Sequence, residues 1–197
     1  MIKFPTSQYT PAQGLSLCIA DQDQLLRLEY DASMTRHKSS PWWGTAVGFR
    51  AMQRAALALS DEYLWSRDEL VVVSGHPGPG VLDALNFVTA CVDRARLIMP
   101  QNPNCETRCN AAMKFEWWVS DSERTVHIQL RRDFVPDEFY TLIDRVLDGR
   151  STAEDQWRFE SFKVNLAARI WIEPLDQSFS VAYLAPLGPG AMPPQQG

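Results

Sequence analysis

The sequence LVVVSGHPGPGVLDAL, residues 70–85, predicts a buried strand that turns sharply into a helix. Three consecutive valines favour a strand, and the helical spacing of apolar residues begins at Val81. In the turn between them, glycines permit backbone angles that are closed to other residues, and prolines stiffen the chain. His76 lies in this turn, next to the free N–H groups of the helix start. We therefore expect a ligand or a reactive side chain to be held there.

The segments around this turn predict an α+β fold: a mixed β-sheet of about four to five strands, helices packed on it, and a helical C-terminal region. An amphipathic helix is expected over residues 45–60, with Arg50, Gln53 and Arg54 on its polar side. The other expected elements are a helix over 81–92, a strand over 96–99, a hairpin of strands 114–119 and 125–130, a helix over 136–149 and a last helix from 151 to Pro174.

Alternation in the second strand of the hairpin places His127 and Gln129 on the side opposite to three apolar residues, so one face of the hairpin is expected to be exposed. Ser151 and Glu154 match a capping box, which starts the last helix.

Composition along the chain predicts one domain over residues 36–183. Residues 1–35 are expected to be a loosely ordered lead-in with one amphipathic segment near residues 24–30. Residues 184–197 are rich in glycine and proline and have too little apolar surface to order themselves.

The charge pattern excludes several partners. The formal net charge is −5, and lysine and arginine form no cluster of the kind that binds nucleic acid.

No run approaches the roughly 18 apolar residues of a membrane span, and the N-terminus lacks the apolar core of a signal peptide. We expect a cytoplasmic protein with reduced cysteines.

Tryptophans and cysteines supply the remaining candidates. The chain has seven tryptophans, and the pairs Trp42-Trp43 and Trp117-Trp118 are expected to fill a core or line a pocket. Cys105 and Cys109 have the spacing of half a metal site, but no second pair follows at a suitable distance. No metal and no cofactor are therefore expected.

Several short pieces of the chain occur in an informative order between about Trp43 and Phe179. A helix with a Gly-aromatic-Arg step comes first, and an Asp-Ala-hydrophobic helix, a Thr-small-Cys step, a basic strand and a turn before the last helix follow. In this order they resemble the FmdE (or FwdE) family of formylmethanofuran dehydrogenase proteins. The pieces are Gly44-Thr45-Ala46-Val47-Gly48-Phe49-Arg50, Asp83-Ala84-Leu85, Thr89-Ala90-Cys91, Arg96-Leu97-Ile98 and residues 147–154.

The resemblance implies a mixed α/β domain that pairs as a dimer and, in several members, binds a divalent metal. The family's His-x-His-x-Cys-Pro-Gly run before the first helix is replaced here by KSSPWWG, residues 38–44, and its second cysteine position is taken by Gly80. Of the thiols, only Cys91 falls on a family cysteine. Because indole and serine are not zinc ligands, the family's metal site does not carry over, and Trp42-Trp43 offers flat apolar surface instead.

Two functions remain open from the sequence. The first is an FmdE-like, non-catalytic accessory protein, dimeric, that binds a small molecule or an oxidoreductase partner through an apolar pocket formed by Trp42, Trp43, His76, Asp83 and Cys91. The alternative is a small enzyme in which His76 is the general acid/base and Asp83 or Cys91 assists, or a metal-binding component of a redox complex. The glycine spacing of the turn does not fit a dinucleotide loop.

The lost histidine and cysteine positions generate a first prediction. Purified protein should carry no stoichiometric zinc or iron after dialysis, which elemental analysis would measure. About one metal ion per chain would contradict this prediction, and His37, His76, Cys91, Cys105 and Cys109 would then be the candidate ligands.

Overall fold

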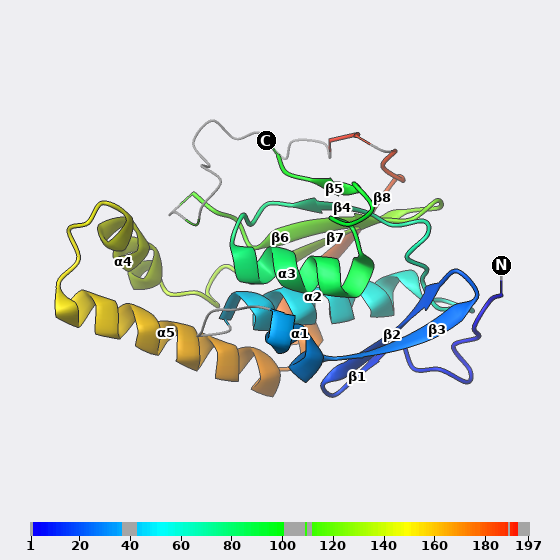
Figure 1. Ribbon diagram of the computed structural model, residues 1–197, viewed down its shortest axis with the longest axis horizontal. Helices are drawn as coiled ribbons and strands as arrows, with labels where there is room; N and C mark the ends of the chain where they lie inside the picture. The colour runs from blue at the N-terminus through cyan, green and yellow to red at the C-terminus, as the bar shows by residue number, and fades with distance from the viewer. Residues whose placement is uncertain (1, 37–42, 101–108, 110–111, 189, 193–197) are drawn as a thin grey trace.

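A computed structural model describes residues 2–36, 43–100, 109, 112–188 and 190–192 of the chain. The described residues form a five-stranded mixed sheet, a three-stranded antiparallel sheet and six helices (Figure 1). The α+β class and the mixed sheet expected from the sequence are thus confirmed. No described helix has the length and apolar character that a membrane span requires.

The five-stranded sheet has the order β5-β4-β6-β7-β8; β4 and β5 are parallel, and the other neighbours are antiparallel. Its strands are β4 (Val71–Ser74), β5 (Leu97–Ile98), β6 (Glu116–Ser120), β7 (Thr125–Leu130) and β8 (Phe179–Leu184). The small sheet contains β1 (Ala12–Gln13), β2 (Ser16–Asp21) and β3 (Gln24–Glu29). The helices are α1 (Tyr30–Arg36), α2 (Trp43–Leu59), α3 (Pro79–Thr89), α4 (Asp137–Leu147), α5 (Ala153–Ile172) and α6 (Leu175–Ser178).

Helices α2 and α3 lie side by side under the five-stranded sheet (Figure 1). A Cβ on Gly48 would be 3.1 Å from the Cβ of Ala84, and one on Gly44 would be 3.2 Å from the backbone N of Val81. The two glycines therefore let α2 approach α3 closely. Because Gly44 meets the start of α3 and Gly48 meets its second turn, the helices run parallel and both begin at the same edge of the molecule.

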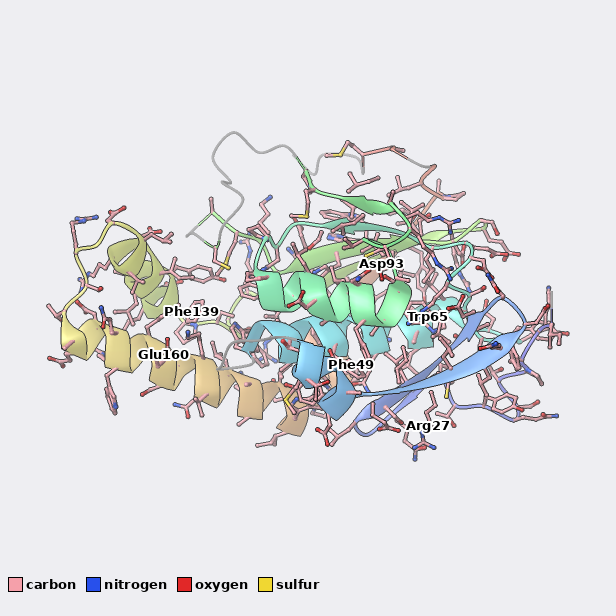
Figure 2. The ribbon with its side chains drawn as sticks, in the orientation of Figure 1. Arg27, Phe49, Trp65, Asp93, Phe139 and Glu160 are labelled. Carbon is pink, nitrogen blue, oxygen red and sulfur yellow. The ribbon has the colours of Figure 1, made fainter. Side chains whose placement is uncertain are left out.

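Helix α2 lies at the centre of the fold. It was expected to be amphipathic, but it is not. Two of the three side chains assigned to its polar side are buried, Arg50 at 8% exposed and Gln53 at 1%, and the third, Arg54, is half-buried. The reason is that α2 contacts α1, α3, α5 and both sheets, so it has almost no solvent side. Phe49 lies in this core (Figure 2), with its ring 5.6 Å from that of Tyr30.

Arg50 and Gln53 connect α2 to distant parts of the chain. Arg50 donates from Nε to the carbonyl of Ile170 (3.0 Å) and from Nη2 to that of Glu173 (2.9 Å), at the C-terminal end of α5. Its Nη1 donates to Oε1 of Gln53 (3.0 Å). Burial lowers the pKa of the Arg50 guanidinium to about 10.

The N-terminal segment differs from the expected loose lead-in, because it forms the small sheet and α1. Leu17 and Ile19 alternate along β2 and are fully buried against the core. Gln53 donates from Nε2 to the carbonyls of Gly14 and Ser16, each at 2.9 Å. On the face of β2 that meets the core, Leu17 and Ile19 are the two large apolar side chains. Such a small number explains why the composition of the segment did not reveal its ordered structure.

The hairpin of β6 and β7 is also more buried than expected. Every residue of β6 and all of β7 except Gln129 are buried. Strand β8, absent from the sequence-based expectation, pairs with β7 along its full length. The segment after β8 continues across the sheet, where the N–H of Leu187 donates to Oγ of Ser120 (2.8 Å) and Oγ1 of Thr125 donates to the carbonyl of Ala185 (2.9 Å).

Helices α4 and α5 form a hairpin that projects from one end of the sheet (Figure 1). Phe139 of α4 points toward α5 (Figure 2), and its ring lies 5.2 Å from that of Phe159. The capping box at the start of α5 is formed by Thr152 and Asp155, one residue later than the expected pair. Thr152 accepts from the N–H of Asp155 (3.1 Å), and the carboxylate of Asp155 accepts from the N–H of Thr152 (3.0 Å).

Replacing Arg50 tests the central role of α2. Arg50→Met keeps an unbranched stem but removes the guanidinium, so the buried carbonyl of Ile170 and the partly buried carbonyl of Glu173 lose their donor. We expect the free energy of unfolding to fall by about 2–4 kcal/mol, measured by urea denaturation. Arg27→Met is the control, because the Arg27 side chain is 71% exposed; equal losses in both variants would contradict the prediction.

Candidate functional site

His76 lies in the turn between β4 and α3 and is 3% exposed. Its Nδ1 accepts a hydrogen bond from the N–H of Gly78 at 3.0 Å, so the neutral ring carries its proton on Nε2. Burial lowers the pKa of His76 to about 3. The hydroxyl of Ser74 donates to the carbonyl of His76 at 3.0 Å and fixes the backbone of the same turn. His76 is therefore a neutral group at physiological pH, held in one orientation.

Trp43, the first residue of α2, shares a ring neighbour with His76. Both rings contact Phe115: the ring centroids of His76 and Phe115 are 4.5 Å apart, and those of Trp43 and Phe115 are 5.7 Å apart. Trp43 also stacks on Phe134 with an angle of 2° between the planes. Its indole N–H is buried and has no hydrogen-bond partner in the part of the chain that the structure describes. The structure thus brings together two of the expected site residues, with two ring N–H groups.

The other expected site residues do not join this group. Cys91 follows the C-terminal end of α3, whereas His76 precedes its start, and the 11 residues of α3 separate them by about 16 Å of helix rise. Asp83 is half-buried in the second turn of α3. Trp42 lies outside the described residues, as does Cys105. Burial raises the pKa of the Cys91 thiol, which is 1% exposed.

The thiol beside His76 belongs to Cys109. A Cβ placed on Gly78 would come within 2.8 Å of Sγ of Cys109 and within 2.6 Å of Cε1 of His76, so all three groups converge on the turn. Burial raises the pKa of the Cys109 thiol. No pattern in the sequence predicts this approach, because Cys109 lies in a polar segment without periodicity. Both described thiols near α3 are therefore poor nucleophiles.

A second group of polar residues lies on the face of the sheet turned away from α2 and α3. Nε2 of His127 and Oε2 of Glu116 are 3.3 Å apart, and the rings of His127 and Trp118 stack with centroids 4.4 Å apart and 3° between planes. All three residues are less than 9% exposed. A Cβ on Gly75 would lie 2.9 Å from Cγ of Glu116, so the side chain of Glu116 packs against a position where only a glycine leaves room for it. The alternation in β7 correctly separated His127 from the apolar face, but burial of this second face was not visible in the sequence.

A cavity of about 440 Å³ lies at the far end of β4 from His76. Its charged lining residues already have hydrogen bonds: Asp68 accepts from Arg94, and the carboxylate of Asp121 accepts from two backbone N–H groups of the hairpin turn. The lining consists of Asp68, Glu69, Val71, Arg96, Asp121, Ser122, Pro186, Leu187 and Gly188. This open cavity has both charged and apolar lining residues and contains none of the residues expected to form the apolar pocket.

Among the described residues, no three side chains of His, Cys, Asp or Glu lie close enough together to hold a metal ion. Compared with known protein families and with curated proteins, the chain matches no family model and no curated sequence. Its function must therefore be inferred from the residues themselves.

The buried imidazole generates a prediction about pH. The pKa of His76 is about 3 in the folded protein and 6.5 in the unfolded chain, so between these values the unfolded chain binds a proton that the folded protein does not. The contribution of the neutral His76 side chain to the free energy of unfolding is complete above pH 6.5. It decreases as the pH falls toward 3, by up to about 1.4 kcal/mol per pH unit. His76→Asn retains an acceptor for the N–H of Gly78 but does not titrate.

We expect the free energies of unfolding of wild type and His76→Asn to converge as the pH is lowered from 7 to 4. Chemical denaturation at each pH measures this difference, in which the titration of other groups cancels. A constant difference across this range would show that the imidazole of His76 does not titrate on unfolding.

Proposed function

We propose that the chain is an FmdE-like accessory protein that binds a small molecule without transforming it, and that it is a cytoplasmic homodimer. The order of the FmdE-like pieces supports the family assignment. The structure adds that two of these pieces, on α2 and α3, pack directly against one another through Gly44 and Gly48. An oxidoreductase is the class of partner that this resemblance suggests.

The state of the candidate catalytic groups supports a binding function. A histidine with a pKa of about 3 is protonated too rarely near neutral pH to be an effective general acid, and it is too weak a base to take up a proton. The thiols of Cys91 and Cys109 have raised pKa values and are held in the thiol form. None of these residues has the properties that its catalytic role would need.

The unpartnered indole N–H of Trp43 is the observation that carries this proposal. A buried donor without a partner costs about 1–3 kcal/mol, and a ligand with an acceptor oxygen would remove that cost. Nε2–H of His76, whose ring also contacts Phe115, is a second candidate donor. A small molecule with carbonyl or carboxylate oxygens fits these two donors and the aromatic surface around them.

A second candidate function follows from Glu116 and His127. Nε2 of His127 lies 3.3 Å from Oε2 of Glu116, and a carboxylate that orients an imidazole recurs in acid–base catalytic sites. If the chain is an enzyme, His127 is therefore a better candidate for the base than His76. If the wild type shows turnover of a substrate, loss of that turnover in His127→Gln but not in His76→Asn would favour this second function.

The binding proposal predicts a specific effect of removing one N–H group. Trp43→Phe keeps an aromatic ring but deletes the indole donor, so the variant should lose a small molecule that co-purifies with the wild type. Trp117→Phe is the matched control, because Trp117 is also buried with an unpartnered indole N–H but lies on β6. Both variants should lose a similar free energy of unfolding, about 1–3 kcal/mol.

Mass spectrometry of the small molecules released on denaturation measures the bound fraction. Stoichiometric ligand should be found with wild type and Trp117→Phe, and at least tenfold less with Trp43→Phe. Equal amounts in all three proteins would place the ligand elsewhere, and no ligand in the wild type would contradict tight binding.

A further inference from the structure

Helix α5 exposes large apolar side chains along one side. Trp157 is 70% exposed, Val164 57% and Ile172 81%. Separations of seven and eight residues place the three on the same side of a helix. A tryptophan is seldom so exposed on an isolated domain, because its burial contributes more than that of any other side chain. This side of α5 is therefore an unpartnered apolar surface.

Two small residues complete the surface. Ser161 and Ala168 lie between the large ones at helical spacing, and Glu160, which pairs with Lys163, borders the series. We name the five residues Trp157, Ser161, Val164, Ala168 and Ile172 the α5 stripe. Its order of sizes is large, small, medium, small, large. The stripe therefore has nearly the same shape when read in either direction.

We propose that the α5 stripe binds the α5 stripe of a second copy of this chain, with the two helices antiparallel and a two-fold axis at Val164. The inference rests on the proposed homodimer and assigns its interface. An antiparallel pair places Trp157 against Ile172 of the partner subunit at each end. The small residues then face each other and let the helices approach, while Val164 meets its own copy on the axis. Such self-complementarity is what a two-fold interface requires.

The charges of α5 favour the same arrangement. Its N-terminal half contains three acidic residues and one arginine, whereas the charged residues of its C-terminal half, Lys163 and Arg169, are basic. Antiparallel pairing places each acidic half beside the basic half of the partner subunit. The macrodipoles of the two helices are then antiparallel, which is the favourable arrangement. A parallel pair would have neither advantage.

A hollow of about 150 Å³ lies on α5 beside Trp157. In the antiparallel pair, this hollow faces the other end of the partner helix and receives the partner subunit's Ile172. The bulky ends of the stripe thus have a complementary recess. The hollow is lined by Trp157, Arg158, Ser161, Phe162 and Asn165.

Opposite charges at position 164 provide the test. Val164→Glu and Val164→Lys each place two like charges together at the axis, so each variant alone should sediment with the mass of one chain. Mixed in equal amounts, the two variants should form a dimer, because a glutamate then faces a lysine. Wild type should sediment as a dimer at micromolar concentration. This rescue is specific for a two-fold axis at Val164.

Val92→Glu is the matched control, because Val92 is 48% exposed outside the stripe; this variant should remain dimeric. Thermal melts by circular dichroism should be unchanged in the charged variants at concentrations where all are monomeric. Monomeric wild type would overturn both the homodimer and the α5 interface. Dimeric Val164→Glu, or failure of the mixed variants to associate, would overturn the α5 interface alone. Dissociation of Val92→Glu would remove the specificity on which the assignment depends.

Discussion

The buried contact of Arg50 with the end of α5 is the constraint on which the rest of the structure depends. The ion pairs of the described residues include none with Arg50; instead, the carbonyls of Ile170 and Glu173 and the amide of Gln53 accept hydrogen bonds from its guanidinium. The stacking of Arg50 over Trp171 adds a cation–π contact at 5.0 Å. Since Gln53 in turn binds the carbonyls of Gly14 and Ser16, two neighbouring side chains of α2 hold the N-terminal segment and the end of α5 on the same helix.

With α2 fixed in this way, its glycines decide where the candidate site lies. Gly44 and Gly48 bring α3 into backbone contact, and the parallel packing places the start of α2 beside the turn that precedes α3. Trp43 and His76 consequently meet on Phe115, although they are far apart in the chain. The same geometry sends Cys91 to the opposite end of α3. The composition of the site is therefore a direct consequence of how closely two helices approach.

The two faces of the five-stranded sheet have different chemistry. The face toward α2 is apolar and contains Trp117 and Ile128 as cross-strand neighbours. The opposite face buries Glu116 and His127, whose interaction occurs in a region of low dielectric where an unpaired charge would be costly. The Trp43–His76 group and the Glu116–His127 pair therefore lie in physically separate parts of the molecule and differ in chemistry.

The sequence alone determined the local elements. Valine runs, glycine–proline turns and helical spacing located β4, α2, α3, the hairpin and α4, because these signals act over a few residues. It also indicated His76, because the turn that contains it is itself a local feature. The resemblance to the FmdE family pointed to the same segments, and it remains the basis of the proposed function.

Only the tertiary structure decided which side chains are buried and which meet. Arg50 and Gln53 are polar residues on a helix that the sequence presents as half-exposed, yet long-range packing buries most of that helix. Cys109 reaches His76, and Cys91 does not, because loop position and helix length fix their distance from the turn. Such contacts join residues far apart in the chain, and periodicity and propensity describe only neighbours.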